Sequence, residues 1–108
     1  MAKFLTTGYG DQAGYDRTDQ AVRDAAHAHD DRLRAAGATI AIARTPVQVR
    51  NHDAAGITLT EGAYMVSDLP IAGFAIIEAP TFEDAVELVA HTPCAVAQGV
   101  VEVWPLGD

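Results

Sequence analysis

The chain has 108 residues, 49% of them hydrophobic and 20% charged, which predicts one globular domain over residues 1–108. Fifteen acidic against seven basic residues give a net charge of −8, which excludes the basic face needed by nucleic-acid binders and disfavours anionic membrane surfaces. No apolar run reaches the about 18 residues of a membrane span and no signal-peptide pattern is present, so a cytoplasmic protein is expected.

The first predicted strand covers residues 3–7 and precedes the turn formers of "GYGDQAGYDR". A long helix is then predicted from its N-cap at Thr18 to a stop at Gly37, because apolar residues recur every three or four positions. They form one stripe, made of Val22, Ala25, Ala26, His29, Leu33 and Ala36.

Four strands are predicted next, at residues 38–43, 45–50, 57–66 and 72–79, with a hairpin loop at 51–56. Thr81 caps a second helix, with Asp84 three residues on, and Pro93 is predicted to stop it. Residues 99–104 form the last predicted strand.

Without the central hairpin, this order reduces to two β-α-β halves, the pattern of an α+β, ferredoxin-like split βαβ fold. Both helices of such a fold cover one face of the sheet. The other face is predicted to be too apolar for water, so a second copy should cover it, giving a homodimer with a dimeric α+β barrel. The residues predicted on that open face are Thr6, Ile40, Ile42, Ile76, Val101 and Val103.

Five segments, "FLTTGYGDQ", "LRAAGATI", "EGAYMVSDLPIAGF", "FEDAVELVAHTP" and "GVVEVWPL", together resemble the YCII-related family. Within it, residues 61–74 resemble the signature of the branch named after an Asp-Gly-Pro-Phe motif. Gly62, Gly73 and Phe74 match that signature, whereas Glu61, Ala63 and Tyr64 stand in place of its Asp, Pro and Phe.

The resemblance implies a dimeric ferredoxin-like fold and, by similarity to small dehydrohalogenases or lyases, a His-Asp acid-base pair. The positions of that pair fall on Ala26 and Thr92 in this sequence, with His27 one residue away.

His29 is the predicted catalytic base, because it lies on the apolar stripe of the long helix, where partial burial can hold the pKa of a histidine near neutrality. The alternative is a structural histidine bonded to a backbone carbonyl. Whether His27 or His29 faces the cleft is left open by the pattern. Asp68, in the signature loop, is the second predicted catalytic residue, with a solvated loop carboxylate as its alternative.

Three further residues are predicted to bind the substrate. Tyr64 and Tyr9 have apolar rings with hydroxyl donors and are expected to line the cleft, or else to pack at strand ends. Arg44 is expected to clamp a carboxylate, or else to pair with surface acids.

No metal site and no cofactor are predicted. His27 and His29 are two residues apart and point in different directions on a helix, and a pair made of His27 and Asp31 supplies too few ligands for zinc. The single Cys94 is predicted to be a small, buried hydrophobic residue and is compatible with a reducing compartment.

The sequence therefore predicts a small-molecule enzyme with cofactor-independent proton-transfer chemistry, of lyase, isomerase or cyclase type. Its substrate is expected to be apolar or aromatic and to bind between the long helix and the sheet. The alternative is a non-catalytic, dimeric ligand-binding or accessory module. The two hypotheses make different predictions for His29→Ala, which should abolish the function of an enzyme and leave the function of a binding module intact.

Overall fold

The structure of the protein, a computed structural model, describes residues 1–107 and contains a four-stranded sheet at its centre. Its strands are β1 (Ala2–Tyr9), β2 (Thr39–Ile42), β5 (Ile71–Ala79) and β6 (Val100–Pro105). They lie in the order β2-β5-β1-β6, and every neighbouring pair is antiparallel. This is the strand order of a split βαβ unit, so the predicted α+β, ferredoxin-like fold is confirmed.

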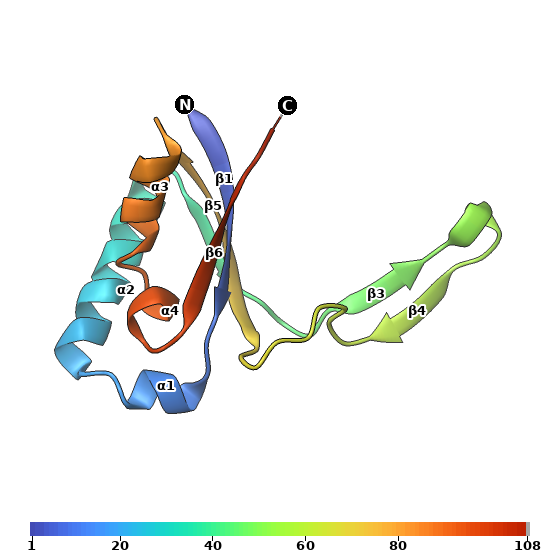
Figure 1. Ribbon diagram of the computed structural model, residues 1–108, viewed down its shortest axis with the longest axis horizontal. Coiled ribbons are helices and arrows are strands. Elements are labelled where there is room, and N and C mark those ends of the chain that lie inside the picture. Colours follow the sequence, from blue (N-terminus) through green and yellow to red (C-terminus); the bar gives the residue numbers. More distant parts are fainter. Residues whose placement is uncertain (108) are drawn as a thin grey trace.

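Three helices cover one face of this sheet, as Figure 1 shows. They are α2 (Gln20–Ala35), α3 (Phe82–Val89) and α4 (Pro93–Val96). The core lies between them and the two central strands. Its buried residues are Phe4, Ile77, Ala79, Ala85 and Val89.

The predicted helix ends are mostly reproduced. Gly37 has a φ of 108° just past α2, and the Thr81 hydroxyl accepts a hydrogen bond of 3.1 Å from the Asp84 amide at the start of α3. Pro93 does not stop α3, which ends at Val89; it occupies the first turn of α4, where its missing N–H costs nothing.

A short helix, α1 (Gln12–Asp16), lies in the segment that the sequence predicted as turns. The Asp11 carboxylate caps it by accepting a hydrogen bond of 2.8 Å from the Gly14 amide. Thr18 is not the N-cap of α2, which begins one residue after Asp19. Instead the Thr18 hydroxyl is buried and donates to the Gly14 carbonyl at 2.9 Å, joining α1 to α2.

The central hairpin stands apart from this body. β3 (Val47–Arg50) and β4 (Thr58–Glu61) form a separate two-stranded sheet, joined by the 3-10 turn η1 (His52–Ala54). We call residues 44–70 the arm. It projects away from the body on the side of the sheet opposite the helices (Figure 1), and none of its residues is buried.

The open face of the central sheet differs from the predicted one by one residue in register. Phe4 and Ile77 pack against the helices, so their neighbours along each strand point the other way. Of the six residues predicted on the open face, Ile76 alone lies there, whereas Thr6, Ile40, Ile42, Val101 and Val103 lie on the helix side. The open face instead carries Leu5, Thr7, Tyr9, Phe74, Ile76, Val100, Glu102 and Trp104.

Candidate functional site

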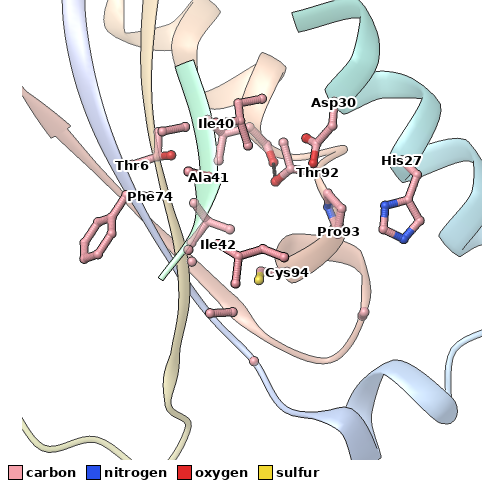
Figure 2. Close-up of a pocket in the computed structure, with 18 of the residues that line it drawn as sticks. Thr6, His27, Asp30, Ile40, Ala41, Ile42, Phe74, Thr92, Pro93 and Cys94 are labelled. Atoms are coloured by element: carbon pink, nitrogen blue, oxygen red, sulfur yellow. Dashed lines mark hydrogen bonds between the residues drawn. The ribbon is translucent and has the colours of Figure 1, made fainter. Parts of the chain in front are cut away.

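A cavity of about 530 Å³ lies between α2, α4 and the helix side of the sheet (Figure 2). Its volume falls in the range of small-molecule sites. Most of its wall is apolar, contributed by the sheet and by the inner faces of the helices. Among these residues are Leu33, Ile40, Ile42, Ala75, Ile77, Val89 and Val101.

Polar groups are concentrated where α2 meets α4. α2 contributes His27 and Asp30, which are three residues apart and therefore lie on the same side of the helix. The segment entering α4 contributes Thr92 and Cys94. Figure 2 shows both α2 side chains extending toward Pro93, at the start of α4. An apolar cavity with a small set of convergent polar groups is the usual form of a ligand site.

Asp30 is the charged group placed most deeply in this polar corner. It is half-buried, and no hydrogen bond or ion pair joins its carboxylate to another side chain within residues 1–107. Burial raises the pKa of Asp30, and the positive charge of Arg34 opposes this effect only in part. A carboxylate with a raised pKa is a stronger base, which suits it to accept a proton from a bound molecule.

The raised pKa of Asp30 has a consequence for stability. Burial gives Asp30 a higher pKa in the folded state than in the unfolded state. Its protonated form therefore contributes stability to the fold that is complete below the pKa of the unfolded state, and this stability is lost as the pH rises through the pKa of the folded state. Asp30→Asn cannot ionise, so we expect its unfolding midpoint to exceed that of the wild type at pH 7. The difference should shrink toward pH 3. Thermal unfolding followed by circular dichroism measures the midpoints of the two proteins at each pH. Equal midpoints at pH 7 would contradict a raised pKa of Asp30.

His27 lies at the outer rim of the cavity and is exposed. Its Nε2 lies 2.9 Å from the Tyr15 hydroxyl, which comes from α1. The Tyr15 ring in turn lies under the Arg23 guanidinium, with the carbon of that group 4.6 Å from the ring centroid. This chain of contacts fixes α1 against α2 and orients the imidazole at the cavity mouth.

Cys94 lies on the floor of the cavity. Burial raises the pKa of its thiol, and the negative charge of Asp30 raises it further. The thiol is therefore protonated and a poor nucleophile at neutral pH, in line with the small-core-residue interpretation.

The influence of Asp30 on Cys94 predicts a measurable coupling between them. In Asp30→Asn the pKa of the thiol should fall, because one of the two causes that raise it is removed. The rate of alkylation by iodoacetamide as a function of pH measures this pKa. A profile that does not move between wild type and Asp30→Asn would show that the two groups do not interact.

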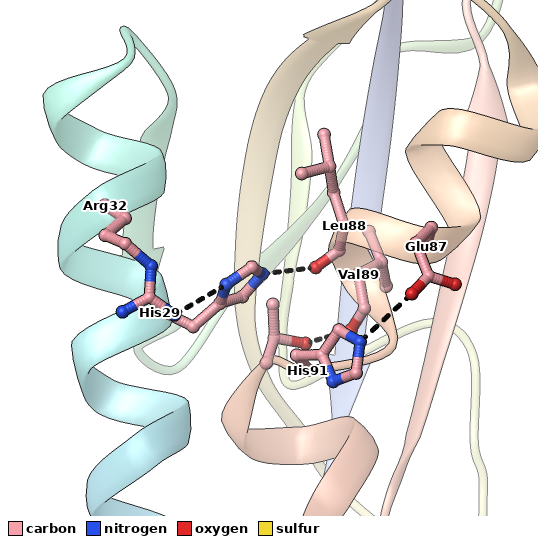
Figure 3. Close-up of polar contacts among 7 residues, drawn as sticks. His29, Arg32, Glu87, Leu88, Val89 and His91 are labelled. Atoms are coloured by element: carbon pink, nitrogen blue, oxygen red, sulfur yellow. Dashed lines mark hydrogen bonds and ion pairs between the residues drawn. The ribbon is translucent and has the colours of Figure 1, made fainter.

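The structure places His29 outside this cavity (Figure 3). Its Nε2 donates to the Leu88 carbonyl oxygen at 2.6 Å, and its Nδ1 accepts from Arg32 Nη2 at 3.3 Å. The imidazole rings of His29 and His91 pack edge to face, with their centroids 5.7 Å apart. Of the two candidate histidines on α2, His27 is thus the one that lines the cavity.

The other four predicted site residues also lie away from the cavity. The Tyr9 hydroxyl donates to Glu102 Oε1 at 2.6 Å on the open face of the sheet, and this hydrogen bond raises the pKa of Tyr9. Arg44, Tyr64 and Asp68 are exposed residues of the arm. The structure therefore does not bring the five predicted residues together.

Sequence reasoning did not single out Asp30. The signal was nonetheless present, because Asp30 completes a helical stripe with the buried residues Ala26 and Leu33, at spacings of four and three. A carboxylate on the buried stripe of an amphipathic helix requires a partner or a ligand.

Comparison with known families agrees with the sequence resemblance. The model of the YCII-related domain matches residues 2–107, almost the whole chain. A comparison with curated proteins gave no match. Within residues 1–107 no three His, Cys, Asp or Glu side chains are grouped so as to hold a metal ion, and no helix is long and apolar enough to cross a membrane.

Proposed function

The chain belongs to the YCII-related domain family, and from this premise we propose that it is a small-molecule enzyme that transfers protons within the cavity between α2 and the sheet. The observation that carries the proposal is Asp30, a half-buried carboxylate at the polar end of an apolar cavity, with no side-chain hydrogen bond or ion pair within residues 1–107. The reaction would be of lyase, isomerase or cyclase type.

In the proposed reaction, Asp30 acts as the base. One carboxylate oxygen accepts a proton from a C–H group next to a carbonyl, and the electron pair of that bond moves toward the carbonyl oxygen to give an enolate. Returning the proton to another atom completes an isomerisation, and loss of a leaving group completes an elimination. Burial of Asp30 supports this role because the same desolvation that raises its pKa increases its drive to take a proton.

His27 and Tyr15 are proposed to act at the oxygen end of the substrate. Both line the rim of the cavity and they already contact each other at 2.9 Å. Either group donates a hydrogen bond when its proton faces the substrate, which would stabilise the charge that develops on the oxygen. These residues replace the arrangement centred on His29 and Asp68 that the sequence suggested.

The walls of the cavity support an apolar or aromatic substrate. Ile40, Ile77 and Val101 offer flat apolar surface for a ring. The negative charge of Asp30 disfavours ligands that carry a negative charge nearby. A neutral aromatic ketone is therefore a suitable probe, and phenylacetone combines a ring, a carbonyl and acidic C–H groups in a small molecule.

The test of this function is proton exchange in D₂O. If the cavity transfers protons, the α protons of phenylacetone should be replaced by deuterium faster with the protein than in buffer of equal pH, as followed by ¹H NMR. Exchange at the buffer rate for phenylacetone and for a small panel of aromatic ketones and enols would contradict the proposal.

A second candidate function is a non-catalytic ligand-binding or accessory module. The observation that favours it is the absence, within residues 1–107, of a hydrogen bond between His27 and Asp30, because His27 is engaged with Tyr15 instead. This candidate predicts that the cavity binds aromatic ligands without exchange of their protons. Binding and exchange measured on the same sample separate the two.

We further propose that the protein works as a homodimer in the cytoplasm. The open face of the sheet exposes Phe74, Ile76 and Trp104, and apolar strand surface of this kind favours burial against a second copy. The free Cys94 is compatible with a reducing compartment. Membership of the branch named after the Asp-Gly-Pro-Phe motif stays a prediction.

A further inference from the structure

The arm is an amphipathic hairpin whose apolar side is bare. In β3 and β4, Val49 lies directly opposite Leu59, and side chains alternate between two faces along each strand. Val47, Val49 and Leu59 therefore share one face, where Glu61 stands opposite Val47, and Ile57 lies just before β4. The four apolar residues Val47, Val49, Ile57 and Leu59 are between 54% and 71% exposed. We call these four residues the apolar face of the arm.

The opposite face of the same hairpin is polar and is satisfied within the arm. The Arg50 guanidinium donates to Gln48 Oε1 at 2.8 Å and to the Thr60 hydroxyl at 3.4 Å. Thr58 lies opposite Arg50 on the same side. An antiparallel sheet that is polar on one face and apolar on the other is built to pack its apolar face on something.

The body of the same chain, over the residues that the structure describes, does not cover this face. The arm projects away from the sheet (Figure 1), and none of its residues is buried. A lone two-stranded hairpin is at best marginally stable in water, so a single chain does not explain three β-branched residues and a leucine exposed on one hairpin. The missing contact must come from another molecule.

The open face of the central sheet offers the matching surface. It exposes Phe74 by 44% and Trp104 by 51%, and Ile76 lies on β5 two residues from Phe74, on the same face. Figure 2 shows the Phe74 ring pointing away from the cavity residues, off this face. The arm leaves the body on this same side of the sheet (Figure 1).

We propose that the apolar face of the arm of one copy packs on the open sheet face of a second copy, and that the exchange is reciprocal. This inference rests on the homodimer of the proposed function and names its interface. A two-fold axis lets each arm cover the other copy's sheet, which closes the assembly at two chains. A partner of a different kind would have to cover two separate surfaces of this chain, the apolar face of the arm and the open sheet face. A second copy of the chain supplies a matching surface for each of them.

The sizes of the two surfaces are adequate for a stable dimer. The four residues of the apolar face of the arm are 54% to 71% exposed, and Phe74, Ile76 and Trp104 of the sheet face are 37% to 51% exposed, so each copy offers two apolar surfaces to the contact. A standard stable interface buries about 800 Å² per partner.

The first experiment compares Leu59→Asp with the matched control Thr58→Asp by analytical ultracentrifugation. The wild type should sediment as a species of twice the 11.4 kDa chain mass. Leu59→Asp should weaken the dimer by about 100-fold or more, because a carboxylate would enter an apolar contact. Thr58→Asp, one residue away on the polar face, should leave it unchanged. Far-UV circular dichroism establishes that both variants fold.

A second experiment identifies what the arm touches. In a Cys94→Ala background, Leu59→Cys combined with Ile76→Cys should give disulfide-linked dimers under mild oxidation, whereas Leu59→Cys alone should give none. The first position belongs to β4 in the arm and the second to β5 in the central sheet, two strands that stand apart in Figure 1, so a bridge between them joins two copies. Linked dimers of Leu59→Cys alone would mean that two arms pair with each other, which overturns the inference.

Failure of the arm contact and failure of the dimer are distinct results. If Leu59→Asp remains a dimer like the wild type, the arm contact is wrong and the homodimer stands. If the wild type sediments as a monomer, both the arm contact and the homodimer are wrong. Neither result bears on proton exchange, which is measured independently in the cavity.

Discussion

Replacing Asp30 by Asn is expected to lower the protein-dependent exchange of the α protons of phenylacetone by about 100-fold or more. The amide has the same size and shape as the carboxyl group but cannot accept the proton. Because no side-chain hydrogen bond or ion pair of Asp30 within residues 1–107 would be broken by the change, the cavity should keep its form. The loss of rate would then report the base itself rather than damage to the fold.

The pH dependence of wild-type exchange adds a second signature. The rate should rise with pH through the pKa of Asp30, which burial raises from its ordinary value, and then level off. In Asp30→Asn this step should disappear.

Asp31→Asn is the matched control for this substitution. Asp31 is the next residue on α2, but its carboxylate is exposed and pairs with Arg34 at 3.2 Å on the helix surface. Exchange by Asp31→Asn should stay within about twofold of the wild type, since an exposed ion pair of this kind contributes little. If Asp30→Asn instead keeps the full wild-type rate, another group is the base and the proposed mechanism is wrong.

Replacing Gly99 by Ala is expected to destabilise the fold by about 3 kcal/mol or more. Gly99 lies between α4 and β6, where its amide donates to the Cys94 carbonyl at 3.1 Å. A Cβ at this position would lie 2.2 Å from the Tyr9 carbonyl oxygen and 2.6 Å from the Cys94 carbonyl oxygen. Both atoms belong to the backbone, so no side-chain rotation can relieve the overlap.

The control for Gly99 is Gly107→Ala, because a Cβ there meets nothing within 4 Å. Urea unfolding followed by tryptophan fluorescence gives the free energy of unfolding of each variant. Gly107→Ala should match the wild type closely. A Gly99→Ala variant of wild-type stability would show that α4 and the cavity floor can shift freely, contrary to a preformed site.

Local sequence patterns were sufficient for the fold. The apolar stripe of α2, the Thr81 cap and the alternation in β5 each reflect contacts between near neighbours along the chain. The short helices α1 and α4 were not predicted, because each depends on contacts with residues outside it. One such contact is the hydrogen bond from the Thr18 hydroxyl to the Gly14 carbonyl. The open sheet face was assigned to the wrong side because a shift of one residue reverses the direction of every side chain.

The site was harder to predict than the fold, because it depends on which side of α2 faces the sheet. His29 was chosen for its place on the apolar stripe, but that part of the stripe turns toward Leu88 and His91. Asp30 was passed over because a charged residue is normally assigned to the solvent side of a helix. Only the packing of α2 against β2 and α4 makes it part of a cavity wall.

Tyr64 and Asp68 were predicted from the signature loop and Arg44 from the central hairpin, and all three lie away from the cavity for a different reason. That loop is part of the arm, which extends away from the body instead of folding over the cavity. Hydrophobic periodicity gives the strands of a hairpin but contains no information on whether the hairpin packs on its own chain.

The measurement that tests the central claim most directly is a titration of the ¹⁵N-labelled protein with phenylacetone, followed by amide NMR spectra. If the cavity is the ligand site, the amides of Gly8, Gly10 and Gly73, which line it, should shift with one saturable curve. The amides of Gly56 and Gly62 on the arm should stay in place. Shifts confined to the arm, or no shift at any residue at millimolar ligand, would contradict the account.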